Sequence, residues 1–243
     1  MRFDVVTLFG SMFSSLTDEG ITSRAMKRGL WSLQTWNPRD FVSDVHRTVD
    51  DRPFGGGPGM VMMAEPLAQS IEAIRASGNR GKVVSFAPSG KKLDDEWVRK
   101  TVAAGEDIVL VCGRYEGIDQ RFLDRYVDEQ ISIGDYVLSG GELAAMVLMD
   151  AVVRQLPGAI KELSTLDESF STGLLDAPHY TRPEVWRDEK VPEVLMSGHH
   201  RNIQKWTREK ALAATATNRP ELITIARSKN LLTKEDEAYL RTL

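Results

Sequence analysis

The chain has 243 residues, of which 42% are hydrophobic and 27% are charged, and its formal net charge is -4. These proportions are ordinary for a globular protein, and they exclude a disordered chain and a collagen. The single cysteine, Cys112, excludes an intrachain disulfide, and no apolar run is long enough for a membrane span, so we expect a cytoplasmic protein without a membrane partner.

The first 160 residues alternate between strand-like and helix-like segments. Short β-branched or apolar runs predict strands at 3–9, 82–86, 107–112 and 130–133. Helical spacing of apolar residues predicts helices at 66–78, at 93–104, after Gly117 and at 142–153. This alternation predicts an α/β domain over residues 1–160, with a mostly parallel sheet and helices on its faces.

Glycines are unusually dense between Gly55 and Gly59. Each one costs conformational entropy and adds no packing, so we expect another group to approach this backbone closely. The spacing matches neither a phosphate-binding Walker loop nor a dinucleotide fingerprint. A functional loop and a structural hinge are both compatible with the pattern.

Two more glycine-bearing loops follow predicted strands, at 113–117 and 134–141. Ligands of open α/β sheets bind beyond the carboxyl ends of the strands, where glycines expose backbone groups to an adenine or a ribose. The two loops together predict a pocket for a nucleoside-bearing cofactor. Taken alone, each loop is equally well explained as a tight turn into the next helix, where glycines are common for conformational reasons.

Residues 161–174 are polar, small and weakly periodic, which predicts a flexible linker. Beyond it, helical patterns at 199–216, 220–228 and 233–243 predict a small, all-helical domain over residues 175–243. From Arg182 onward, 12 Lys and Arg stand against nine Asp and Glu, so the tail is the basic part of the chain.

Three cations of this tail share one helical face, because Arg201, Lys205 and Arg208 are spaced at i, i+4 and i+7. The stripe is typical of a phosphate-contacting surface, and equally of a solvated helix face. The four histidines, in contrast, have no spacing typical of metal ligands, so we predict no metal held by protein ligands.

Five longer motifs follow one another along the chain: DDRPFGGGPGM at 50–60, VCGRYEGID at 111–119, SIGDYVLSGGE at 132–142, GLLDAPHYTRPEV at 173–185 and MSGHH at 196–200. Together they closely resemble the bacterial tRNA (guanine-N1)-methyltransferases, and the resemblance covers nearly the whole chain.

The resemblance implies an enzyme that transfers a methyl group from S-adenosylmethionine to N1 of the guanine immediately 3′ of the anticodon in tRNA, which prevents frameshifting. It implies the SPOUT fold, in which the C-terminal part of the α/β domain threads a trefoil knot. It also implies a homodimer in which the linker and C-terminal domain of one subunit complete the site of the other.

The resemblance further assigns residues to the cofactor and to the tRNA. Those assigned to the cofactor are Pro88, Gly113, Ile133, Gly134, Asp135, Tyr136, Val137, Leu138, Gly140 and Gly141. The residues that we assign to the tRNA are Gly59, Tyr115, Arg201, Lys205 and Arg208, and Tyr115, Tyr136 or the glycines at 55–59 are the candidates for holding the target guanine.

Methylation at N1 requires a base for the N1 proton and a donor that stabilises the charge developing toward O6. The family carries an aspartate directly before Ser-Phe in the linker. Here Glu168 stands at that position and is our predicted base, with Asp167 as the alternative. Arg154 matches the family's arginine at the end of the buried helix and is the predicted donor; a helix C-terminal charge that binds nothing is its other interpretation.

The family is associated with Mg2+, and an ion held by the RNA or the cofactor needs no protein ligands. Two alternatives to the predicted activity are a catalytically silent RNA-binding protein and a SPOUT enzyme acting on ribosomal RNA or on a ribose 2′-hydroxyl. The acidic linker and the motif at 173–185 argue against the second of these.

Overall fold

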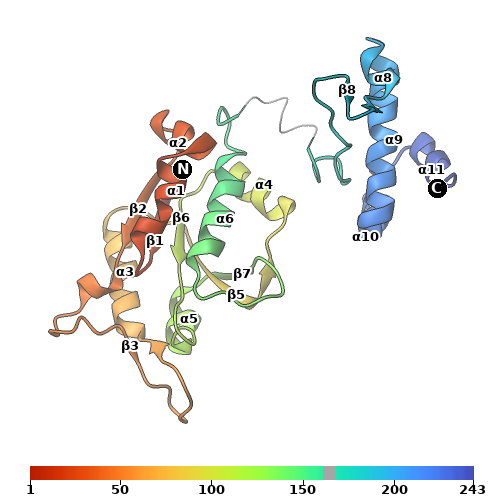
Figure 1. The fold of residues 1–243 in the computed structure, drawn as a ribbon. Coiled ribbons are helices and arrows are strands. Elements are labelled where there is room, and N and C mark those ends of the chain that lie inside the picture. The colour runs from red at the N-terminus through yellow and green to blue at the C-terminus, as the bar shows by residue number, and fades with distance from the viewer. Residues whose placement is uncertain (161–167) are drawn as a thin grey trace. The chain divides into compact units, whose positions relative to one another are not determined.

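The computed structural model describes residues 1–160 and 168–243, and the chain divides into two compact units, Met1–Ile160 and Lys161–Leu243 (Figure 1). The predicted alternative base, Asp167, lies outside the described residues. Among the described helices, none combines the length and the apolar character that crossing a bilayer demands.

A five-stranded sheet, in which every pairing is parallel, forms the centre of the first unit with the order β2-β1-β6-β5-β7. Its strands are β1 (Arg2–Val6), β2 (Ser32–Trp36), β5 (Lys82–Lys92), β6 (Ile108–Val111) and β7 (Glu129–Ser132). The predicted α/β class with a mostly parallel sheet is therefore confirmed. The four predicted strands are present, and the half-exposed edge strand β2, which has no clear apolar alternation, was missed.

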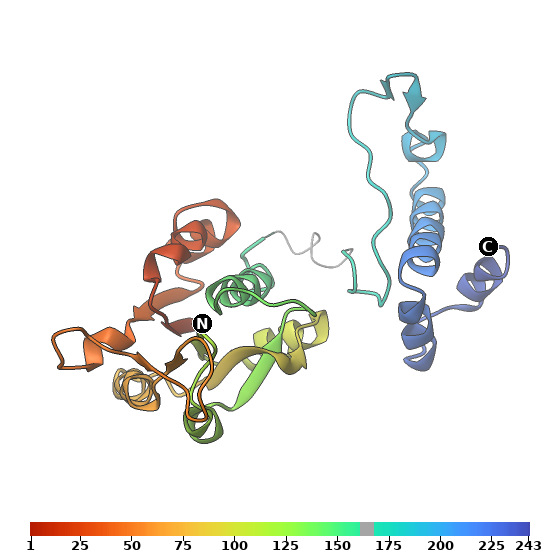
Figure 2. The same cartoon turned by 60° about the horizontal axis from the view of Figure 1, so that its bottom comes forward.

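Helices cover both faces of this sheet (Figures 1 and 2). They are α1 (Ser14–Thr17), α2 (Gly20–Lys27), α3 (Ala64–Ala76), α4 (Asp95–Ala104), α5 (Gln120–Tyr126) and α6 (Glu142–Val153), with the short 3-10 turns η1 (Gly10–Phe13) and η2 (Pro38–Phe41). One apolar core joins the sheet to α1, α2, α4 and α6, and a second core joins its other face to α3 and α5. Helix α6 has the bounds that the apolar run predicts, because nearly every residue in it is apolar and one face is buried on the sheet.

A buried polar cluster lies on β1, an inner strand of the sheet. The Asp4 carboxylate is fully buried, forms an ion pair with Arg2 at 2.7 Å, and accepts hydrogen bonds from Trp36 Nε1 at 2.6 Å and Asn79 Nδ2 at 2.7 Å. A buried charge is tolerated when it is paired and hydrogen-bonded in this way.

The glycine-dense segment lies beside a short antiparallel pair, β3 (Asp50–Asp51) and β4 (Val61–Met62). The loop between these strands extends away from the sheet, as the orange segment of Figure 1 shows. Gly55, Gly56 and Gly57 all have positive φ, and an added Cβ there would meet nothing within 4 Å. Backbone conformation, and not a close neighbour, accounts for glycine at these three positions.

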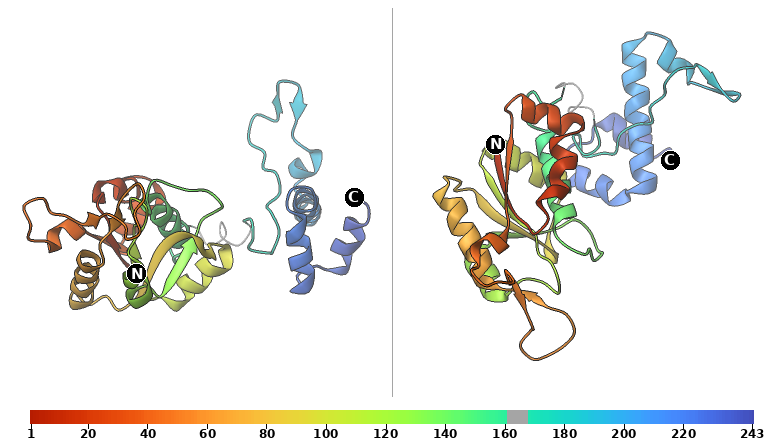
Figure 3. Two further views of the ribbon diagram at one scale, coloured as in Figure 1. Left: turned by 90° about the horizontal axis from the view of Figure 1, so that it is seen from below. Right: turned by 60° about the vertical axis from the view of Figure 1, so that its left-hand side comes forward.

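The second unit is mainly helical but contains a β-hairpin. Its helices are α8 (Glu193–Met196), α9 (His200–Asn218), α10 (Pro220–Ser228) and α11 (Lys234–Leu240), and Leu174, Leu212, Ile223 and Ala226 form its core. The predicted all-helical domain is wrong in one element, the hairpin of β8 (Val185–Trp186) and β9 (Glu189–Lys190), which projects from the helices in the right-hand view of Figure 3. Strands of two residues are too short to show a periodicity in sequence.

Candidate functional site

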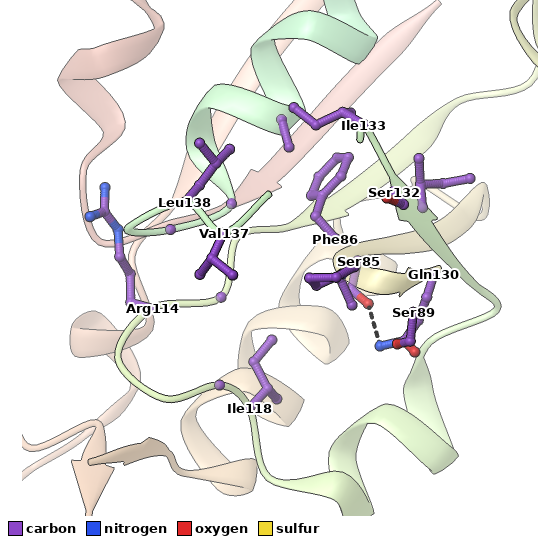
Figure 4. Close-up of a pocket in the computed structure, with 18 of the residues that line it drawn as sticks. Ser85, Phe86, Ser89, Arg114, Ile118, Gln130, Ser132, Ile133, Val137 and Leu138 are labelled. Carbon is purple, nitrogen blue, oxygen red and sulfur yellow. Dashed lines mark hydrogen bonds between the residues drawn. The ribbon is translucent and has the colours of Figure 1, made fainter. Parts of the chain in front are cut away.

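A pocket of about 410 Å³ opens in the first unit, where β5, β6 and β7 meet the loops that follow them (Figure 4). This volume lies within the range of small-molecule sites, and the place agrees with the rule that ligands of parallel sheets bind beyond the strand ends. Three chain segments contribute most of the lining, at 85–89, 113–118 and 130–141.

The first segment results from a slip in strand pairing. Phe86 and Lys91 of β5 both lie opposite Ile131 of β7, so residues 87–90 bulge out of the ladder. Pro88 and Ser89 line the pocket from this bulge. The sequence predicted a strand ending at Phe86 because a bulge followed by renewed pairing has no simple apolar pattern.

The other two segments are the two glycine loops, and the structure brings them together. The backbone N–H of Gly141 donates to the carbonyl oxygen of Gly113 at 2.9 Å. A Cβ added at Gly141 would lie 2.8 Å from the Cα of Cys112, and one at Gly140 would lie 2.3 Å from Nε of Arg114. These two glycines permit a close approach that a larger residue would prevent.

Nine of the ten residues assigned to the cofactor by resemblance line this pocket: Pro88, Gly113, Ile133, Gly134, Tyr136, Val137, Leu138, Gly140 and Gly141. Asp135 belongs to the same loop without contributing to the lining. Phe86, Leu138 and Ile118 supply apolar surface, and Ser85 accepts a hydrogen bond from Gln130 Nε2 at 3.4 Å (Figure 4). Beside the pocket, burial raises the pKa of the Cys112 thiol well above its usual range, so this cysteine stays protonated.

Tyr115 is the predicted tRNA contact that lines the pocket. Its backbone is left-handed, with φ of 60°, and burial together with the neighbouring Asp50 raises its pKa. Gly59 lies next to the pocket wall, since its Cβ would come within 2.4 Å of Glu116 Cγ, and Glu116 N donates to Met60 O at 2.9 Å. The glycine-dense loop thus ends against this pocket.

Sequence reasoning missed several lining residues, among them Ser85, Arg114, Glu116, Gln130 and Ser132. Arg114 and Glu116 stand inside the motif at 111–119, at the carboxyl end of β6. Because ligands of parallel sheets bind at the carboxyl ends of strands, this position could have indicated that both side chains line a ligand pocket.

The two residues predicted to act on guanine belong to different units. Arg154 is the C-cap residue of α6 and is half-buried. Its backbone N–H donates to the carbonyl oxygen of Asp150 at 3.1 Å. Glu168 begins the described part of the second unit, where its carbonyl oxygen accepts from the Ser171 hydroxyl at 2.7 Å. Neither residue lines the pocket of the first unit.

The three cations of the basic stripe differ in their surroundings. Arg201 is exposed, and Lys205 is 77% exposed with Glu209 at 3.8 Å. Arg208 is instead only 30% exposed, and its guanidinium donates to both carboxylate oxygens of Asp236, at 3.1 and 2.9 Å. Two of the three cations thus face solvent, whereas the third joins α9 to α11.

No group of three or more histidine, cysteine, aspartate or glutamate side chains suited to a metal occurs within residues 1–160 and 168–243.

Comparison with known proteins identifies the family of this chain. The family model described as tRNA (Guanine-1)-methyltransferase TrmD matches residues 1–225. A tRNA (guanine-N(1)-)-methyltransferase of Janthinobacterium sp. (strain Marseille) is 55% identical over 249 aligned positions and covers 100% of both chains. Proteins of the same name from Burkholderia mallei (strain SAVP1) and Burkholderia pseudomallei (strain 668) are also 55% identical, over 100% of this chain and 94% of theirs. The chain belongs to the tRNA (guanine-N1)-methyltransferase family.

Proposed function

We propose that this protein transfers the methyl group of S-adenosylmethionine to N1 of the guanine immediately 3′ of the anticodon in tRNA, and so prevents frameshifting in the cytoplasm. The observation that carries the proposal is the pocket built from the family's own glycine loops. Full-length relatives named for N1 of guanine in tRNA support the substrate.

The lining of the pocket suits S-adenosylmethionine. Leu138, Ile133 and Phe86 present apolar surface to an adenine, and Ser85, Gln130 and Ser132 add polar groups to the same lining. When bound, the cofactor supplies an activated methyl group on a sulfonium, so the protein has to orient it and exclude water.

Proton transfer is the chemistry left to the protein, because neutral guanine carries a proton on N1. The Glu168 carboxylate would accept the N1 proton, so that N1 could bond to the methyl carbon as the sulfonium sulfur of a bound cofactor gave it up. Arg154 donates toward O6, where negative charge develops. Asp167 is the alternative base.

Binding of tRNA uses the exposed cations Arg201 and Lys205 for phosphates, with Tyr115, Tyr136 and Gly59 near the target base. Arg208 contributes by joining α9 to α11 through Asp236, which keeps the other two cations in place. Any Mg2+ that the reaction requires is held by the RNA or the cofactor.

We further propose the SPOUT knot and a homodimer. One face of helix α6 is buried, yet its Leu143 and Val147, one turn apart, are 47% and 49% exposed, and Ile21 of the neighbouring α2 is 37% exposed. An apolar surface of this kind suits a second copy of the chain. Light scattering should give the mass of two chains.

Methyl transfer from labelled S-adenosylmethionine to two unmodified tRNA transcripts tests the activity. The transcripts are identical except that one has adenine in place of the guanine 3′ of the anticodon. Label on the guanine transcript alone supports the proposal, whereas label on both places the target elsewhere. Binding of tRNA without any transfer would identify a silent RNA-binding protein.

A further inference from the structure

A buried carboxylate lies beside the cofactor pocket without a part in the proposed chemistry. Glu142 is the first residue of α6, and its side chain is 1% exposed. Its Oε1 accepts a hydrogen bond from the Thr7 hydroxyl at 2.9 Å, and its Oε2 lies 2.9 Å from Nε of Arg114. The positive end of the helix dipole favours a carboxylate here, but so deep a charge also requires its cationic partner.

The cationic partner, Arg114, reaches from one glycine loop to the other. It stands in the loop after β6, and its Nη1 donates to the carbonyl oxygen of Ser139, in the loop after β7, at 3.2 Å. Its Cζ lies 4.3 Å from the centre of the Phe9 ring, which covers one face of the guanidinium. Arg114 lines the pocket, at the edge of the loop that carries Leu138 (Figure 4).

The glycine beside this arginine is matched to it. A Cβ at position 140 would lie within 2.7 Å of three guanidinium-end atoms of Arg114, Nε, Cδ and Cζ. The arginine side chain is 18% exposed, and Glu142 balances its charge. An RNA phosphate therefore has little of this charge to bind, and the guanidinium serves to connect the two loops.

We infer that Glu142 is a positioning residue, which holds Arg114 between the two loops so that the loops at 113–117 and 139–141 stay in the cofactor-binding arrangement. Without the carboxylate, Arg114 has a weaker hold on Ser139 and the loop samples open states. The apparent dissociation constant of a ligand rises in proportion as its binding-competent state becomes rarer. The inference rests on the proposed use of S-adenosylmethionine.

Glu142→Gln tests this with the smallest change in shape, because the amide oxygen still accepts from Thr7 while the negative charge is lost. We expect the dissociation constant for S-adenosylmethionine, measured calorimetrically without tRNA, to rise about tenfold. The KM for the cofactor should rise in parallel, while kcat at saturating cofactor stays within about threefold of wild type, as expected when binding is lost equally from ground and transition states.

Asp4→Asn is the matched control, since Asp4 is also a buried carboxylate paired with an arginine, Arg2, in the same unit and away from the pocket. It should lower the melting temperature without changing cofactor affinity. If Glu142→Gln likewise lowers the melting temperature and leaves the dissociation constant unchanged, the pair is merely structural and the inference is overturned. Wild-type protein that binds no S-adenosylmethionine would overturn the proposed cofactor itself.

Arg114→Lys keeps the inference testable even if Glu142→Gln does not fold. Lysine retains a positive charge for Glu142 but lacks the planar fork that reaches Ser139, so cofactor affinity should still fall. Arg114→Met and Glu142→Gln should also be combined. Because the two residues act as one unit, the double variant should bind the cofactor no more weakly than whichever of these two single variants binds it more weakly. Multiplied losses in the double variant would show independent roles and contradict the inference.

Discussion

The backbone N–H of Gly141 donates to the carbonyl oxygen of Gly113 at 2.9 Å, and this hydrogen bond joins the loop after β7 to the loop after β6. Two segments that are separated by a helix and a strand therefore form one wall of the pocket in the first unit. The wall depends on a very close backbone approach at Gly141.

Gly141→Ala should weaken binding of S-adenosylmethionine by about tenfold or more, because the new Cβ would lie 2.8 Å from Cys112 Cα and overpacking costs about 1–3 kcal/mol. Calorimetry measures the affinity. Gly105→Ala is the control: Gly105 caps α4 with φ of 64° and has nothing within 4 Å of its Cβ position, so alanine there strains only the backbone. Equal loss of affinity in both variants would mean that general destabilisation is the cause.

Glu168→Gln should lower the rate of methyl transfer by about 10²–10⁴-fold, the usual contribution of a general base. Binding of S-adenosylmethionine by the first unit should be unchanged. Asp167→Asn, assayed beside it with the same tRNA, should keep most of the activity. The reverse pattern in these two variants would assign the base to Asp167.

Arg154→Ala should lower kcat by about 10²–10³-fold, as removal of a single donor to a developing negative charge does. Affinity for the cofactor should stay near that of wild type, because Arg154 is not part of the pocket lining. Arg154→Lys restores the charge and should recover part of the rate. An alanine variant that retains most of its activity on tRNA would leave Arg154 as a helix C-terminal charge only.

Arg201→Ala and Lys205→Ala should each weaken tRNA binding and reduce the salt slope of the binding constant by about one counterion. Filter binding at several salt concentrations measures both quantities. Arg208→Met should act differently, because its guanidinium is held by Asp236, and should mainly lower the melting temperature. A salt slope unchanged in the first two variants would show that the stripe is an ordinary solvated face.

Asp236 should make stability depend on pH. Burial raises its pKa, but the hydrogen bonds from Arg208 and Thr233 outweigh burial and hold it below the ordinary value of 3.8. Since the unfolded chain binds this proton more tightly, the contribution is fully present above the unfolded pKa and is lost as the pH falls through the folded one.

Urea unfolding near neutral pH and again well below the ordinary aspartate pKa checks the prediction. Wild type should lose more of its free energy of unfolding on acidification than Asp236→Asn, which has no proton to gain at that site. The remaining carboxylates are common to both proteins, so the difference isolates Asp236. Equal losses of unfolding free energy in the two proteins would contradict a lowered pKa of Asp236 in the folded state.

Much of this protein could be read from its sequence. The buried helix at 142–153, the core strands and the two glycine loops follow from apolar periodicity and turn residues, which act over a few neighbouring positions. The longer motifs add the family, and with it the pocket residues.

Only the tertiary structure could supply the contacts between distant positions. The sequence does not show that Phe86 and Lys91 both pair with Ile131 of the neighbouring strand. Nor does it show that Arg208 forms an ion pair with Asp236. Glu142 illustrates the reason, because both of its partners are distant in the chain. Thr7 precedes it by 135 residues, and helix α5 and strand β7 separate Arg114 from it. Local patterns determine helices and strands because their energies are local, whereas the meeting of side chains depends on how the whole sheet is ordered.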